Sequence, residues 1–119
     1  WVVLGPGSWR TSVLPHLLLR EQREALSTTN AKRCVVMNLA LDDKESNGLD
    51  AAAHLKLLQQ YAPNLRLDVV IADQSEFEDA ARELGAKVLW ASVRSTTNPN
   101  VHDPLKLASA YNDMFAMRL

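Results

Sequence analysis

The alternation of short apolar runs with helix-like segments constrains this sequence more than any other feature. Four runs, at residues 1–4, 33–39, 67–72 and 87–93, are rich in Val, Leu and Ile. Runs that are apolar almost throughout are typical of parallel strands covered on both faces. Because helix-like segments separate the runs, the sequence predicts a doubly wound α/β sheet of about four mainly parallel strands.

Two of the segments between the runs carry signals for helix ends. The first begins after Asp50 and ends before Pro63. Its apolar stripe consists of Leu55, Leu58 and Ala62. The second has capping-box spacing between Ser75 and Glu78, and Gly85 ends it. Both segments are therefore predicted to be helices that pack one face on the sheet.

A last helix is predicted from Asp103 onward. Pro104 follows Asp103, and proline at the first helical position lacks only an amide that would be unpaired there. The predicted buried face consists of Leu107, Ala108, Tyr111 and Phe115. We interpret the apolar residues near the C-terminus first as part of the core. The alternative is a surface that binds a partner.

Length, composition and charge limit the classes of protein that fit. The chain has 119 residues, of which 47% are hydrophobic, with 13 Lys and Arg against 14 Asp and Glu. We expect a single domain over residues 1–119 that makes no bulk electrostatic contact with nucleic acid. No apolar stretch approaches the roughly 18 residues that span a bilayer. The only cysteine, Cys34, lies in an apolar run, which predicts a buried thiol in a reduced, cytoplasmic protein.

The loop after the first run is the first candidate for ligand binding, since open parallel sheets bind ligands beyond the carboxyl ends of their strands. Its residues are Gly5, Pro6, Gly7 and Ser8, with Thr11 and Ser12 behind them. Glycines let the backbone approach an anion, and hydroxyls donate hydrogen bonds to it. The alternative is a tight turn in which Ser12 is an ordinary N-cap. The full dinucleotide and P-loop fingerprints do not occur, so spacing leaves both interpretations open.

The loop after the second run is the second candidate. Its polar residues are Asn38, Asp42, Asp43, Glu45, Ser46 and Gly48, with His54 on the next helix. Acids at a strand end would hold a metal or a sugar hydroxyl, whereas a solvated turn is the alternative. His54 lies among apolar residues, which favours a partly buried, hydrogen-bonded side chain over a catalytic base.

The other two strand ends offer Asp73 and His102. Asp73 would meet a ribose or a cation, or cap the next helix instead. His102 precedes the last predicted helix and would reach the same cleft. No group of histidines and cysteines has metal-ligand spacing, so no metal site is predicted from these residues.

Taken in order, these motifs resemble the putative gluconeogenesis factor family, which comprises bacterial relatives of 2-phospho-L-lactate transferase. The matching stretches are VVLGPGSWRTSVLPHLL, NLALDDKESNG with His54 six residues after Gly48, VVIAD and HDPLKLA. The resemblance covers essentially the whole chain. It implies a Rossmann-like fold that binds a nucleotide or nucleotide sugar above the sheet. Because the family protein is longer, we expect this chain to be its C-terminal portion.

The resemblance implies a UDP-sugar-binding regulatory protein rather than an enzyme, linked to carbon-source adaptation, cell shape and the supply of cell-wall precursors. The alternative is a transferase that takes a phospholactate-type group from a nucleotide-linked donor, with magnesium held by Asp42, Asp43 or Asp73. The residues that match the family's motifs, and would bind the ligand, are Gly5, Pro6, Gly7, Ser8, Thr11, Ser12, Asn38, Glu45, Ser46, Gly48 and His54. A homodimer is also considered, and no catalytic residue is implied.

Two departures from the family pattern qualify this expectation. The family's second loop usually reads Gln-Pro-Gly before Glu-Thr, whereas Asp42, Asp43 and Lys44 precede Glu45 and Ser46 here. The loss of proline and glycine removes a rigid turn. The glycine-rich loop at the start of the family protein has no counterpart in this sequence. The chain is therefore expected to carry half of a nucleotide site.

Overall fold

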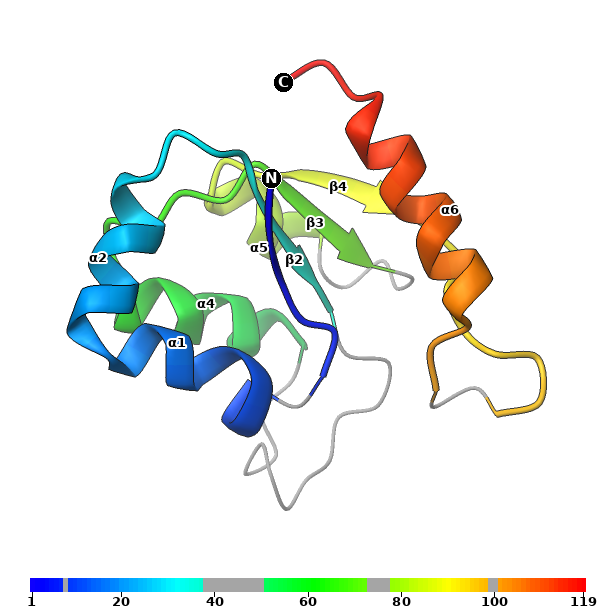
Figure 1. Cartoon of the computed structure of the whole chain (residues 1–119), viewed down its shortest axis with the longest axis horizontal. Coiled ribbons are helices and arrows are strands. Elements are labelled where there is room, and N and C mark those ends of the chain that lie inside the picture. The colour runs from blue at the N-terminus through cyan, green and yellow to red at the C-terminus, as the bar shows by residue number, and fades with distance from the viewer. Residues whose placement is uncertain (8, 38–50, 73–77, 99–100) are drawn as a thin grey trace.

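A parallel sheet lies at the centre of the molecule (Figure 1). The computed structural model describes residues 1–7, 9–37, 51–72, 78–98 and 101–119. Its strands are β1 (Val2–Leu4), β2 (Arg33–Val36), β3 (Val69–Ala72) and β4 (Lys87–Trp90), in the order β1-β2-β3-β4 with all neighbours parallel. Every residue of β2 and β3 is buried, as the almost wholly apolar runs predict. The predicted α/β fold with about four parallel strands is confirmed.

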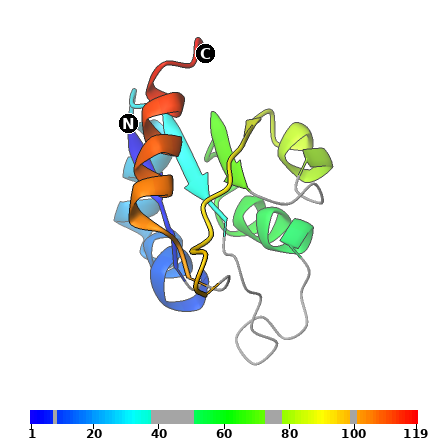
Figure 2. The same ribbon diagram turned by 90° about the vertical axis from the view of Figure 1, so that its right-hand side faces the viewer.

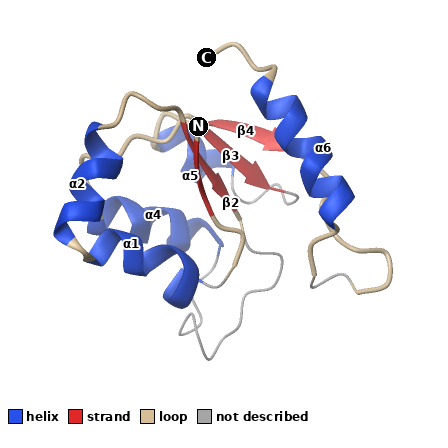
Figure 3. Ribbon diagram, viewed as in Figure 1, coloured by secondary structure: helices blue, strands red, loops and turns tan. Residues whose placement is uncertain are grey.

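Helices cover both faces of this sheet (Figure 3). One face carries α1 (Leu14–Leu18), α2 (Arg20–Thr28), α4 (Ala51–Tyr61) and α5 (Glu78–Glu83), and the other carries α6 (Pro104–Phe115). A helical turn over Trp9–Val13 precedes α1. Each crossover from strand to parallel strand is right-handed by preference, and the strand order advances in one direction. The connecting helices therefore all lie on the same face.

The sheet divides the core into two apolar clusters, because successive side chains of a strand point to opposite faces. Val35 and Val70 pack with Leu17, Leu55 and Leu58 under the connecting helices. On the other face, the buried residues are Cys34, Val36, Val69, Ile71, Val93, Ala110 and Met114. Figure 2 looks onto this second face and shows α6 in front of the side of the sheet formed by β1 and β2. The ring of Trp1 packs edge-on against Phe115 there, with centroids 6.0 Å apart.

The last helix starts as predicted, and its buried face differs from the predicted one at two of four positions. Oδ1 of Asp103 accepts hydrogen bonds from the amides of Leu105 (2.9 Å) and Lys106 (3.1 Å), which confirms the N-cap. The residues that face the sheet are Leu107, Ala110, Tyr111 and Met114. Ala108 and Phe115, predicted to be buried, are exposed, so that part of the prediction is wrong. Both stripes are apolar at helical spacing, and only the docking of α6 on the sheet decides between them.

The Cys34 thiol is fully buried, as the sequence predicts. Burial raises the pKa of this thiol to about 12. Because the thiolate is the reactive form, we expect Cys34 to resist Ellman's reagent at pH 8 in the native protein and to react fully in guanidinium. The absorbance of the released thionitrobenzoate measures both rates. Rapid labelling without denaturant would contradict the burial of this strand.

Among the described residues, every helix is too short or too polar to cross a bilayer.

Candidate functional site

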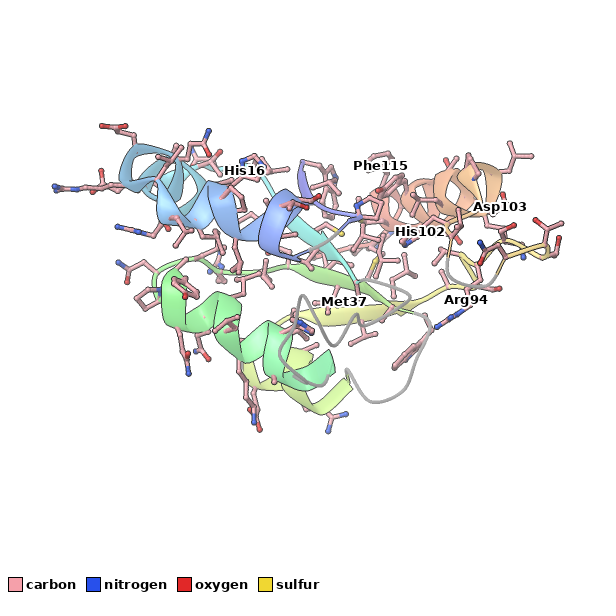
Figure 4. All side chains as sticks on the ribbon, turned by 90° about the horizontal axis from the view of Figure 1, so that it is seen from below. His16, Met37, Arg94, His102, Asp103 and Phe115 are labelled. Carbon is pink, nitrogen blue, oxygen red and sulfur yellow. The ribbon has the colours of Figure 1, made fainter. Side chains whose placement is uncertain are left out.

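The carboxyl ends of the four strands form the edge of the sheet at which such folds bind ligands. Of the predicted ligand-binding residues, the structure describes Gly5, Pro6, Gly7, Thr11, Ser12 and His54. The others, Ser8, Asn38, Glu45, Ser46 and Gly48, lie outside the described residues. Figure 4 views the molecule from this edge, with Met37, which directly follows β2, near the middle of the view.

The Gly5-Pro6-Gly7 segment makes a sharp turn at the end of β1. The Gly5–Pro6 peptide bond is cis, and Gly5 has a φ of +86°. A Cβ at Gly5 would lie 2.8 Å from the carbonyl oxygen of Val36, so the turn passes directly against the end of β2. A Cβ at Gly7 would lie 2.5 Å from Oγ of Ser12. Both glycines are thus required by packing alone, which means that their presence does not by itself indicate a ligand.

The two hydroxyls behind this turn are available to a ligand. The N-cap of α1 is Val13, without a side-chain cap, so the interpretation of Ser12 as an N-cap is wrong. Ser12 lies within the helical turn Trp9–Val13 and faces Gly7. In the part of the chain that the structure describes, neither the half-buried Ser12 nor the exposed Thr11 has a hydrogen-bond partner for its hydroxyl. Both hydroxyls can therefore donate to a ligand on the turn.

His54 lies in the first turn of α4, the next described element after β2. Its side chain is only 3% exposed, and it is held by an interaction within the protein. Leu55 and Leu58 of the same helix belong to the core under the connecting helices. The geometry therefore agrees with a buried, structural histidine and leaves little of its surface for a ligand.

A cavity of about 400 Å³ lies at the same edge, beyond the end of β4. It is lined by Trp90, Ala91, Ser92 and Arg94. In Figure 4, Arg94 lies near His102 and Asp103, and its backbone pairs with that of His102 in an antiparallel bridge. Sequence reasoning treated Trp90 as part of an apolar strand and missed this cavity. The signal was the change from an apolar run to Ser92 and Arg94 at a strand end.

The larger cavity, of about 610 Å³, lies at the opposite edge of the sheet and includes Arg33. The Arg33 side chain is 6% exposed and is already used to hold α2. Its Nε donates to the carbonyl of Leu26 (2.6 Å), and its Nη2 donates to those of Ser27 (3.1 Å) and Thr29 (2.6 Å). The lining also contains Lys32 and Arg66, but the cavity lies away from the carboxyl ends of the strands, where such folds bind ligands. We therefore do not take this cavity as the nucleotide site.

The acids proposed to hold magnesium, Asp42, Asp43 and Asp73, lie outside the described residues. Among the residues that are described, no three His, Cys, Asp or Glu side chains come together as a metal site would require.

The sequence of this chain matches a family of known proteins. Residues 1–113 match the family described as "2-phospho-L-lactate transferase CofD". The chain belongs to this family. The resemblance seen in the sequence is thereby confirmed.

Similar proteins include "Putative gluconeogenesis factor" of Mycobacterium tuberculosis, 37% identical over 124 residues, which cover 97% of this chain and 36% of the relative. The protein of the same name from Mycobacterium leprae is 39% identical over 118 residues, which cover 92% of this chain and 33% of the relative. This CofD-family chain thus spans about a third of the length of the curated relatives that it matches.

A solved structure supports the fold. The crystal structure of a member of the UPF0052 family from Bacillus halodurans superposes with a TM-score of 0.74 at 23% identity, covering 91% of this chain and 41% of that one. The four-stranded sheet of the CofD-family chain is therefore part of a larger domain in that relative.

Proposed function

We propose that this chain supplies one half of a UDP-sugar site in a cytoplasmic regulatory protein that links carbon-source adaptation to cell shape and cell-wall precursor supply. The observation that carries the proposal is the sharp turn at Gly5–Gly7, which presents the unpaired hydroxyls of Thr11 and Ser12 at the ligand-binding edge of the sheet. The proposal has no catalytic step.

The strand order supports this position for the ligand. In doubly wound sheets, the ligand lies where the strand order reverses. The described strands advance from β1 to β4 without reversal, so a reversal would lie at one of the two outer edges of the sheet, and the edge of β1 is the one next to Gly5. Val3 is 36% exposed at that edge, and the relatives are about three times as long as this chain. A further strand beside β1 would place the crevice next to Gly5.

The chemistry of the turn suits a diphosphate. The first 20 residues contain no Asp or Glu, so no carboxylate of that segment repels an anion. The hydroxyls of Thr11 and Ser12 and the amide of Gly7 would donate to phosphate oxygens. Each hydrogen bond to a charged oxygen contributes about 1.5–3 kcal/mol. Several such contacts, less the cost of association, correspond to roughly micromolar affinity.

The competing function is the magnesium-dependent transfer of a phospholactate-type group from a nucleotide-linked donor. The name of the matched family favours it. We rank it second because the described residues that support a ligand, the turn at Gly5–Gly7 and the hydroxyls of Thr11 and Ser12, suit an anion and do not require a metal.

Calorimetric titration of UDP-N-acetylglucosamine into the full-length protein tests the first proposal. We expect binding that weakens at least about tenfold in Gly7→Asp, because two like charges near a protein surface repel by a few kcal/mol. Gly7→Asn is the matched control, since it crowds Ser12 equally but carries no charge. If both variants unfold, Thr11→Asp and Thr11→Asn repeat the comparison at an exposed position.

Equal affinities in the Asp and Asn variants would reduce the turn to a structural element. Absence of binding in the parent, together with chelator-sensitive turnover of a guanosine-linked donor, would favour the transferase. Light scattering of the same samples tests the proposed homodimer, whose contact surface would be the exposed Leu105 and Phe115 of α6.

A further inference from the structure

We propose that the free edge of β4 binds an extended, acidic segment of a partner protein, which joins the sheet as a further strand. Recognition of this kind combines main-chain hydrogen bonds along a strand edge with side-chain contacts on the two faces of the sheet. Among the described strands, β4 forms the edge opposite to β1. The inference therefore goes beyond the nucleotide site that we propose next to Gly5, and it does not rest on that site.

The backbone of β4 has hydrogen-bonding groups on its outer side. In a parallel sheet, the N–H and C=O groups of one residue point to one neighbouring strand, and those of the next residue point to the other side. The amide of Lys87 donates to the carbonyl of Asp68, which directly precedes β3 (2.9 Å). By this alternation, Val88 and Trp90 direct their N–H and C=O groups away from β3. In the described part of the chain, these groups have no hydrogen-bond partner, and an added strand would pair with them.

Two cavities lie along this edge, and Trp90 lines both. The first, of about 350 Å³, is lined by Arg82, Ala86, Lys87, Val88, Trp90 and Met117. It reaches from α5, which packs on one face of the sheet, to Met117, which packs on the other. The second is the cavity of about 400 Å³ beyond the end of β4. The outer side of β4 is therefore hollowed along the length of the strand, and we refer to the two cavities together as the β4 groove.

The charges of the β4 groove favour an acidic occupant. Its described lining contains the cations Arg82, Lys87 and Arg94 and no Asp or Glu. Val88 packs on the core under the connecting helices, so the neighbouring Lys87 lies on the opposite face, where its Nζ donates to the carbonyl of Arg118 (3.1 Å). Arg82 lies on α5, on the face of the connecting helices. A strand in the groove would thus meet positive charge on both of its faces.

Trp90 supplies the β4 groove with an apolar contact surface. Its side chain is 43% exposed at the end of β4. Aromatic side chains on a strand stabilise pairing by packing against their cross-strand neighbours. A second copy of this chain is a poorer occupant, because it would bring two sets of the same cations together with no carboxylate of the described lining between them. The cations and the exposed indole together favour a partner segment with both acidic and apolar residues.

Calorimetric titration of a synthetic peptide into the full-length protein tests this proposal. The probe is a soluble peptide of valine, threonine and glutamate, with glutamates on both faces of the extended chain. A second peptide carries lysine in place of every glutamate. We expect the acidic peptide to bind with an affinity that falls as the salt concentration rises, and the basic peptide not to bind.

Two variants of β4 separate the contribution of charge from that of the main chain. Lys87→Glu should bind the acidic peptide about tenfold more weakly, because an attraction becomes a repulsion. Lys56→Glu is the matched control, since it changes the net charge equally at an exposed position of α4 outside both cavities. Val88→Pro removes one outward amide and keeps the hydrogen bonds between β4 and β3, so it should also lower the affinity about tenfold.

Several outcomes would overturn the proposal. If the parent protein does not bind the acidic peptide, the cations only protect an edge strand from aggregation. Equal binding of the two peptides, or equal losses in Lys87→Glu and Lys56→Glu, would exclude an acidic strand in the β4 groove. A dimer that light scattering detects in the parent and not in Val88→Pro would assign the groove to a second copy. Melting temperatures establish that the variants are folded, and Lys87→Glu keeps the test valid if Val88→Pro is not.

Discussion

Replacing Gly5 by alanine is expected to lower the free energy of unfolding by about 2–5 kcal/mol. Gly5 has a φ of +86°, which costs an L-residue side chain about 1–2 kcal/mol. In addition, the new Cβ would lie 2.8 Å from the carbonyl oxygen of Val36. This oxygen belongs to the backbone at the end of β2 and cannot move without disturbing the pairing of β2 with its neighbours.

Gly85→Ala provides the matched control for this prediction. Gly85 has a similar φ of +77°, but a Cβ there would have nothing within 4 Å. This variant should therefore lose only the conformational part, about 1–2 kcal/mol. Urea unfolding followed by circular dichroism measures both losses. If the two variants are equally destabilised, the close approach of the turn to β2 contributes nothing, and the explanation of Gly5 by packing is wrong.

The strands and the start of α6 were predictable because each depends on local sequence. The buried strands β2 and β3 follow from runs that are apolar almost throughout, and the start of α6 follows from Asp103 and Pro104. The rotation of α6 was not predictable, because two apolar stripes compete on that helix. Only packing against Val36 and Ile71 selects the stripe that contains Met114 and leaves Phe115 exposed.

The candidate site was predictable only in part, for a different reason. Gly5 and Gly7 satisfy a tight turn and an anion site equally well, so their spacing could not decide between them. The structure adds that the Ser12 hydroxyl faces Gly7 rather than capping a helix. The described lining of the cavity beyond β4 comes from residues 90–94 alone, so its signal was local. The change from an apolar run to Ser92 and Arg94 could not be interpreted, because it marks the end of a strand whether or not a cavity lies there.

Replacing Arg33 by alanine is the second change from which we expect a large loss of stability, about 3–5 kcal/mol. The buried guanidinium joins β2 to the C-terminal end of α2 through hydrogen bonds to the carbonyls of Leu26, Ser27 and Thr29. Hydrogen bonds to charged groups are worth about 1.5–3 kcal/mol each, and their loss leaves these carbonyls unpaired. The positive charge also offsets the negative end of the helix dipole.

Two further substitutions test this explanation. Arg33→Lys keeps the charge but replaces the planar fork by a single ammonium, so it should recover only part of the lost stability. Arg20→Ala removes an arginine whose ion pair with Glu24 (3.0 Å) is exposed, and it should cost at most about 1 kcal/mol. Guanidinium unfolding curves compare the three variants. Full recovery in Arg33→Lys would mean that charge alone anchors α2 and that the geometry of the guanidinium is irrelevant. Partial recovery would show that the fork itself joins the helix to the sheet, which explains why an arginine occupies the first position of an otherwise apolar buried strand.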